Sequence, residues 1–127
     1  LAILKFRRCF VLAVTWGSLT EIWVDKKLTS HRAEQALYRE ISLDTIVGYQ
    51  AHGAIVHYEA TPETDIPLRP EGLVLIDSGA QYQDATTDIT RTIALGPVTE
   101  EQRKVYTLVL KGNISMTMVS TCFLTIP

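Results

Sequence analysis

The sequence predicts an α+β fold, in which helices cover one face of an antiparallel sheet. Two observations carry this prediction. The elements follow in the order helix, strands, helix, and the strand segments are short, rich in β-branched and aromatic residues and bounded by turn residues. A length of 127 residues sets a ceiling of one domain, which can bury roughly two thirds of the surface that the unfolded chain exposes.

The first half of the chain is predicted to contain one helix and two short strands. Residues 18–21 have the form of a capping box, and apolar residues recur at helical spacing from there to about Tyr38. Residues 43–50 and residues 53–58 are rich in β-branched and aromatic side chains. They are therefore predicted to form two strands, with a turn near residues 51–53.

The second half is predicted to contain a loop, a hairpin and a helix. Three prolines within residues 61–72 predict a surface loop. A strand over residues 73–76 and a returning strand over residues 86–95 follow, with Asp84-Ala85 as a two-residue turn. A threonine and two glutamates then open a helix that is predicted over residues 99–119.

Charge and cysteine content exclude several classes of function. A net charge of −2 gives no electrostatic reason to expect nucleic acid or an anionic membrane as a partner. Cys9 and Cys122 stand far apart without Cys-x-x-Cys spacing, so neither a zinc knuckle nor a disulfide framework is indicated. A reducing cytoplasm is the expected compartment.

The N-terminal residues 1–16 differ in character from the rest of the chain. They combine three cations with a short apolar stretch over residues 9–14, and the cations exclude a membrane span. The chain does not begin with Met, so a truncated or altered end of a longer chain is favoured over a targeting signal.

Two aspartates are the candidate metal ligands. Asp77 follows a buried apolar run, where a carboxylate is costly to desolvate unless a cation or several donors meet it. With the predicted turn, residue 81 faces Asp88, and the alternation of side chains then puts Asp77 and Asp88 on one face. The same register leaves them four residues out of step, about 13 Å at ~3.3 Å per residue, which is too far to share one ion.

Two interpretations of the hairpin remain open on spacing alone. A metal site requires an irregular hairpin that shortens this gap, and Gly79 is a natural position for a bend or bulge. The alternative is a regular hairpin in which Asp88 is solvated among threonines, since aspartate is common in turns and at strand ends.

Four motifs carry a resemblance to a known family. They are GAIVHY at residues 53–58, DSGAQY at residues 77–82, TTDITRT at residues 86–92 and VLKG at residues 109–112. With these motifs the chain resembles the Xaa-Pro aminopeptidase (aminopeptidase P) family, which belongs to the pita-bread metallopeptidases with prolidase, methionine aminopeptidase and creatinase. The resemblance covers about residues 21–114.

The resemblance implies hydrolysis of the bond between an N-terminal residue and a following proline, by a water held between two divalent metal ions, usually manganese. Asp77 matches a ligand that chelates one ion, and Asp88 matches a ligand that bridges both. His57 matches a catalytic, substrate-binding histidine that contacts the peptide and steadies the oxyanion. Carboxylate oxygens suit manganese, and two ions can activate a shared water. Without the resemblance, a histidine in an apolar strand is more often structural, as His31 and His52 are expected to be.

The resemblance also implies a partial domain. Residues 17–114 correspond to the first half of a pita-bread domain, between divergent segments at residues 1–16 and 115–127. The family site needs a further histidine and two glutamates later in the chain, and here no histidine follows His57 and no glutamate follows Glu101. Two carboxylates alone are expected to hold a divalent ion weakly.

Two smaller departures from the family are Ala85, where the family has glycine, and Asn113, where it has histidine.

Two functions follow as hypotheses. The chain is a fragment of a dinuclear metallo-aminopeptidase acting on peptides with proline at the second position, inactive alone. Alternatively it is a non-catalytic truncated product or a peptide-binding relic of the same fold. A half domain is also expected to expose apolar surface and to self-associate.

Overall fold

The computed structural model describes residues 19–124. The chain divides into two compact units, one up to Pro97 and one from Val98 onward. The predictions for residues 1–16 fall outside the described residues, as do residues 125–127. Within the described part of the chain, no helix is both long enough and apolar enough to cross a membrane.

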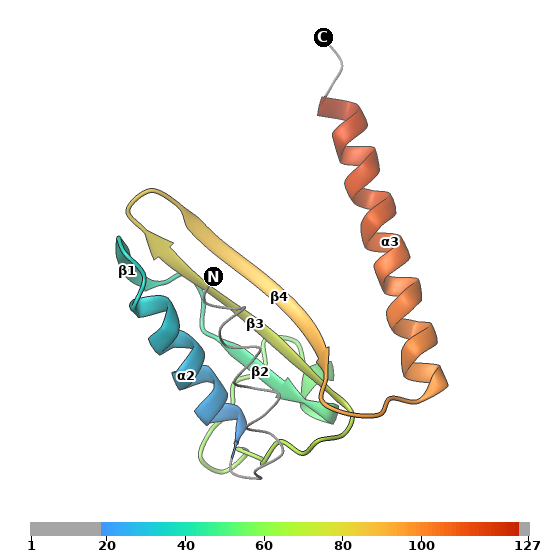
Figure 1. Cartoon of the computed structure of the whole chain (residues 1–127), viewed down its shortest axis with the longest axis horizontal. Coiled ribbons are helices and arrows are strands. Elements are labelled where there is room, and N and C mark those ends of the chain that lie inside the picture. The colour runs from blue at the N-terminus through green and yellow to red at the C-terminus, as the bar shows by residue number, and fades with distance from the viewer. Residues whose placement is uncertain (1–18, 125–127) are drawn as a thin grey trace. The chain divides into compact units, whose positions relative to one another are not determined.

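The first unit is a four-stranded antiparallel sheet with a helix packed against it (Figure 1). Its elements are α2 (Glu21–Ala33), β1 (Tyr38–Ile41), β2 (Ile46–Tyr49), the 3-10 helix η1 (Gln50–Ala54), β3 (Leu73–Tyr82) and β4 (Thr86–Ala94). β4 pairs with almost the whole length of β3, so β1 and β2 share the opposite edge of β3. The predicted α+β class with an antiparallel sheet is confirmed.

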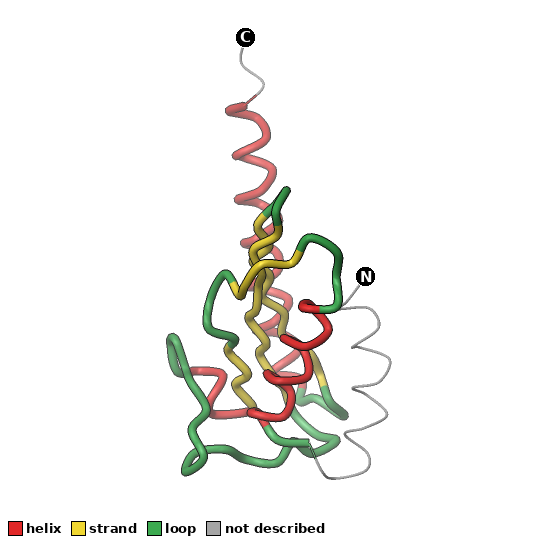
Figure 2. The backbone as a smooth tube through the Cα atoms, turned by 90° about the vertical axis from the view of Figure 1, so that its left-hand side faces the viewer, coloured by secondary structure: helices red, strands yellow, loops and turns green. Residues whose placement is uncertain are grey.

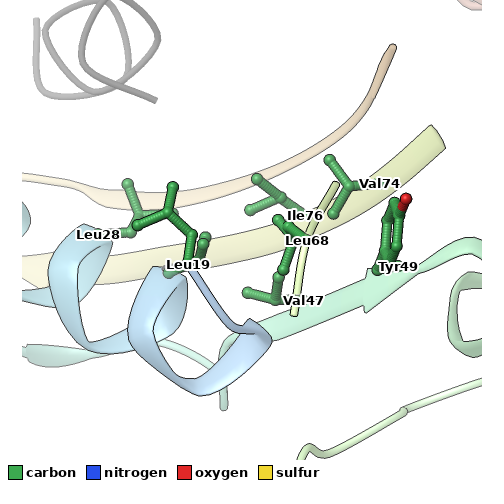
Figure 3. Packing of buried hydrophobic residues seen from close by; sticks show 8 residues of the cluster. Leu19, Leu28, Val47, Tyr49, Leu68, Val74 and Ile76 are labelled. Carbon is green, nitrogen blue, oxygen red and sulfur yellow. The ribbon is translucent and has the colours of Figure 1, made fainter. Parts of the chain in front are cut away.

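The hydrophobic core lies between α2 and one face of the sheet (Figure 3). Because side chains alternate along a strand, Val74 and Ile76 point into this core while Leu75 and Asp77 point to the other face. We call these the core face and the carboxylate face. The buried core cluster comprises Leu19, Val24, Leu28, Val47, Tyr49, Leu68, Val74 and Ile76.

Helix α2 is shorter than the predicted helix. It begins at Glu21 with Thr20 as its N-cap, whose hydroxyl accepts a hydrogen bond from a first-turn backbone N–H at 3.3 Å. It ends at Ala33, and Leu37 has a φ of 67°, which a helix cannot accommodate. The predicted capping box at residues 18–21 is wrong, because the Glu21 side chain is fully buried and bonds elsewhere in the fold.

Residues 53–58 do not form the predicted strand. The chain turns after β2 through Gln50, which has a φ of 52°, forms η1, and turns again at His57, which has a φ of 54°. β-branched residues form a strand only where a partner offers backbone hydrogen bonds, and β2 already occupies this edge of β3. Ile55 and Val56 are left 54% and 83% exposed.

The lengths of two strands also differ from the prediction. β1 was missed because it begins where the predicted helix ends and falls before the first predicted strand, and four residues are too few to show strand periodicity. β3 continues to Tyr82 instead of ending at Ile76, so Asp77 lies inside the central strand. The loop over residues 61–72 and the returning strand agree with the prediction.

The second unit contains α3 (Glu100–Leu124), which confirms the predicted C-terminal helix. Exposed apolar residues accumulate along it. They include Val105, Leu108, Val109, Ile114, Met116 and Val119. Such an accumulation is typical of a surface that contacts other protein.

The loop over residues 61–72 contributes one residue to the core, and this can be tested. Leu68 is 1% exposed within the core cluster. Leu68→Ala is expected to lower the free energy of unfolding by about 2 to 5 kcal/mol, because it removes buried methyl groups and leaves a cavity. Urea unfolding followed by circular dichroism measures the change. Ile55→Ala, at an exposed position, is the control and should change stability by less than about 0.5 kcal/mol. Equal effects of the two variants would contradict the packing described.

A candidate metal centre on the β3–β4 hairpin

The pairing of β3 with β4 places Asp77 and Asp88 on the same face of the sheet. The pairing runs without interruption from Leu73 opposite Ala94, and it puts Asp88 opposite Gly79. Residues 77 and 79 point to one face because side chains alternate, so both carboxylates lie on the carboxylate face. The predicted shared face is confirmed.

The two aspartates are closer in register than predicted. Tyr82 N donates to Ala85 O at 2.8 Å, so the turn is at residues 83–84 and the predicted turn at residues 84–85 is wrong. Asp77 and Asp88 are consequently two residues out of step instead of four, which makes them diagonal cross-strand neighbours. Diagonal neighbours lie about 7 to 8 Å apart. Two carboxylates with metal–oxygen bonds of about 2 Å span that distance.

The irregularity at Gly79 that the metal interpretation required is absent, because the β3–β4 register shows no shift there; the hairpin is regular and Asp88 is exposed, as the alternative interpretation expects. Gly79 instead allows a close approach. Ser42, which follows β1, donates its hydroxyl to Thr87 O on β4 at 2.7 Å and so reaches across β3. A Cβ built on Gly79 would lie 2.0 Å from Thr87 O and 2.2 Å from Ser42 Oγ. A side chain at this position would therefore displace the contact.

The surroundings of the two carboxylates fit a cation. Asp77 Oδ1 is buried and has no hydrogen-bond partner among residues 19–124. Asp88 is exposed. Within residues 19–124, neither carboxylate forms an ion pair with a lysine, arginine or histidine. A buried carboxylate oxygen without a donor is costly unless a cation meets it, so the donor set fits a divalent ion.

The hairpin alone supplies only part of a metal site. Among the described residues, no three or more His, Cys, Asp or Glu side chains come together in an arrangement that could hold a metal ion. Magnesium and manganese prefer several oxygen donors. Asp77 and Asp88 would therefore supply two ligands of such a site, and further donors would have to come from other residues or from water.

The helix η1 lies on the carboxylate face, beside Leu75. Gly48 of β2 pairs with Leu75, and a Cβ built on Gly48 would lie 2.8 Å from Gly53 Cα. A Cβ built on Gly53 would lie 3.6 Å from Leu75 Cβ. Figure 2 shows the same arrangement, with the sheet edge-on, α2 on one side and η1 on the other. The segment that carries His57 thus starts on the face that holds both carboxylates.

Glu21 anchors the segment over residues 49–58 through hydrogen bonds. Its fully buried carboxylate accepts hydrogen bonds from Tyr49 N at 2.7 Å and from the Tyr58 hydroxyl at 2.9 Å. His52 Nδ1 lies 3.0 Å from both carboxylate oxygens. This role of Glu21 was not predicted from the sequence. The signal that could have indicated it is the spacing of Glu21 and Val24, which places both residues on the same buried stripe of α2.

The three histidines have different surroundings. His57 is exposed on a turn with positive φ, between η1 and the buried Tyr58. His52 is part of the Glu21 network, and His31 Nδ1 lies 3.4 Å from Glu34 Oε2, so both have the structural or exposed roles that were expected. The role of His57 stays a prediction.

A cavity of about 450 Å³ lies apart from this centre. It is bounded by α2 and by the connection between β1 and β2, with Ile22, Asp25, Asp44 and Val47 among its lining residues. Neither Asp77 nor Asp88 lines it. The candidate metal centre is therefore defined by a face of the sheet and not by this cavity.

Comparison with known proteins agrees with these features. Residues 5–120 match the family described as Metallopeptidase family M24. The chain is 44% identical over 98 residues to Aminopeptidase P1 of Lotus japonicus, covering 77% of this chain and 15% of that protein. It is 43% identical over 98 residues to Probable Xaa-Pro aminopeptidase P of Chaetomium globosum, covering 77% of this chain and 16% of that protein.

A solved structure has a similar fold. X-prolyl aminopeptidase from Caenorhabditis elegans, described as a cytosolic enzyme with a di-nuclear active site, superposes with a TM-score of 0.70 at 30% sequence identity. The match covers 79% of this chain and 17% of that chain. The present chain thus spans less than a fifth of the length of these three relatives.

The Glu21 network predicts a pH-dependent effect of Tyr58→Phe. The variant is expected to lose about 1 kcal/mol of unfolding free energy at neutral pH, because the hydrogen bond to Glu21 is lost. Burial raises the pKa of the Tyr58 hydroxyl above 10.0, a rise that the Thr64 hydrogen bond opposes and Glu21 reinforces. The contribution of Tyr58 is therefore fully present below a pH of about 10 and is lost as the pH rises through the folded pKa.

The difference in stability between the unaltered protein and Tyr58→Phe should consequently narrow at high pH. Urea unfolding at pH 7, 9 and above 10 measures it, with Tyr106→Phe at an exposed position as the control. A difference that stays constant, or widens, across this range would contradict the buried network.

Proposed function

The chain belongs to metallopeptidase family M24 and shares the pita-bread fold of its structural relatives, and from this premise we propose that it is the first half of an Xaa-Pro aminopeptidase catalytic domain. Its substrates are peptides with proline at the second position. The observation that carries the proposal is the buried, unbonded Asp77 Oδ1 on the same sheet face as Asp88. Similarity to proteins named as aminopeptidase P supports the substrate class.

Asp77 and Asp88 are proposed to hold two divalent ions, with manganese as the expected metal. Bound ions of this kind supply an activated water and polarise the scissile carbonyl. Asp77 holds its position because it lies inside the central strand, between Ile46 of β2 and Thr90 of β4. Asp88 lies on the paired strand and is exposed, so its carboxylate would be accessible to a bound ion.

His57 is proposed to bind the substrate. It lies on an exposed turn that follows η1, and Glu21 anchors the residues on either side of that turn. An imidazole N–H in such a position can donate a hydrogen bond to a peptide carbonyl as negative charge develops on its oxygen. The positive φ of 54° gives the side chain a direction that the predicted strand would not.

We propose that the chain by itself is inactive, acts as part of a larger protein and resides in the cytoplasm. The described residues bring together two candidate metal ligands and no third. The same shortage of metal ligands among the described residues is the observation that supports the alternative function, a non-catalytic peptide-binding module. Self-association through exposed apolar residues of α3 is a further expectation for the isolated chain.

Manganese binding tests the metal site. Titration of the chain with Mn²⁺, followed by calorimetry, is expected to give a weak saturable heat, because two carboxylates and water complete the coordination shell. Asp77→Asn and Asp88→Asn should each remove it. Asp84→Asn, in the exposed turn, is the matched control and should leave it unchanged. Heat that persists in both hairpin variants would exclude the site.

Peptide hydrolysis tests the proposed incompleteness. The chain with Mn²⁺ is expected to release no N-terminal residue from an Xaa-Pro tripeptide beyond a blank with Mn²⁺ alone. Amine release measured over time decides this. Release that disappears in Asp77→Asn would show that the chain carries a complete active site. Peptide binding that survives Asp77→Asn, without release, favours the non-catalytic alternative.

A further inference from the structure

The spacing of the two carboxylates depends on which of two hairpin registers forms. A turn at residues 83–84 and a turn at residues 84–85 give pairings that differ by two residues. Both keep every side chain on its own face, because the faces of a strand alternate with a period of two. The hydrophobic pattern therefore does not choose between them. The observed register separates Asp77 and Asp88 by two residues, and the other separates them by four.

One buried side chain distinguishes the two registers. Arg32, in the last turn of α2, is 4% exposed. Its Nη2 donates to Ser78 O at 3.0 Å and to Ser78 Oγ at 2.9 Å, and its Nη1 donates to Thr87 Oγ1 at 3.3 Å. Ser78 follows Asp77 on β3, and Thr87 precedes Asp88 on β4. The guanidinium therefore ties together the immediate neighbours of both carboxylates, from the core face.

The slipped register would break half of this connection. In the observed pairing Thr87 lies opposite Ala80. A slip by two residues places Ile89 opposite Ala80 and removes the Thr87 hydroxyl from the reach of Arg32. Arg32 Nε already lacks a partner, and Arg32 forms no ion pair within the described residues. A buried guanidinium that loses a further acceptor is strongly disfavoured.

Two neighbouring contacts act in the same direction. Thr87 Oγ1 also accepts a hydrogen bond from Ala80 N at 3.1 Å, and Thr87 O accepts the Ser42 hydroxyl at 2.7 Å. Both contacts require Thr87 at its observed place beside Gly79. Thr87 is thus the residue on β4 where the bonds that define the register converge.

We propose that Arg32 is a positioning residue for the metal centre: through Ser78 and Thr87 it selects the hairpin register that brings Asp77 and Asp88 within reach of shared ions. Its effect on metal binding rests on the proposed function, whereas its effect on the register does not. Contacts on the core face of the hairpin thus position the two carboxylates on the opposite face.

The test uses nuclear magnetic resonance on the isotopically labelled chain, with two readouts from one sample. Cross-strand nuclear Overhauser effects report the register, since Asp88 contacts Gly79 in the observed pairing and residue 81 in the slipped one. Selective broadening of the signals of Asp77 and Asp88 by Mn²⁺ reports metal binding. Arg32→Met removes the donors, and Thr87→Val removes the acceptor while keeping the side-chain shape.

Arg32→Met and Thr87→Val are expected to lose or weaken the contact between Gly79 and Asp88, to gain the contact between residue 81 and Asp88, and to bind Mn²⁺ about tenfold or more weakly. Thr87→Ser, which keeps the hydroxyl, should behave like the unaltered protein. Lys27→Met removes a positive charge from an exposed position of the same helix and should change neither readout.

The outcomes separate this proposal from the proposed function. Retention of the Gly79–Asp88 contact and of Mn²⁺ affinity in both variants, with loss of binding in Asp77→Asn, would overturn the role of Arg32 and leave the metal site intact. Mn²⁺ broadening that is unchanged in Asp77→Asn would overturn the metal site, while the Overhauser contacts still decide the register. If Arg32→Met does not fold, Arg32→Lys, which keeps the positive charge but not the paired guanidinium donors, takes its place, because Thr87→Val also removes the acceptor of Ala80 N.

Discussion

The antiparallel pairing of β3 with β4 is the constraint from which the site geometry follows. β3 is paired along both edges, so its backbone hydrogen bonds are satisfied and its side chains are held in strict alternation. One face buries Val74 and Ile76 against α2, and the other presents Asp77 beside Asp88. Burial of the core face thus determines which way the carboxylates point, and the register determines how far apart they are.

Helix α2 stabilises the hairpin and the neighbouring loop through one buried stripe. The residues of this stripe are Glu21, Val24, Leu28 and Arg32. The apolar pair in the middle packs in the core, and the charged residue at each end meets a segment distant in sequence. A carboxylate near the N-terminus and a guanidinium near the C-terminus also complement the helix dipole. The same helix therefore organises both segments that carry the candidate site residues.

The candidate metal centre on the β3–β4 hairpin is only part of a site, but its two carboxylates have defined positions. Asp77 has a buried oxygen without a donor, and its surroundings contain no counter-ion among the described residues. Only a cation or added donors would offset the desolvation of that oxygen. The chain covers a small share of its relatives, and the remaining ligands are proposed to lie elsewhere in the larger protein. A preformed pair of ligands on rigid strands then reduces the ordering that metal binding requires.

The sequence by itself determined the α+β class, the loop over residues 61–72, β4, α3 and the shared face of Asp77 and Asp88. These depend on local propensity and on the period of two, which residues close in sequence reveal. Tertiary structure alone decided that residues 53–58 are no strand, that Glu21 is a buried anchor, and that the hairpin offset is two residues instead of four. Those outcomes depend on which edge of β3 is free and on contacts such as Arg32 with Thr87, which join residues far apart along the chain.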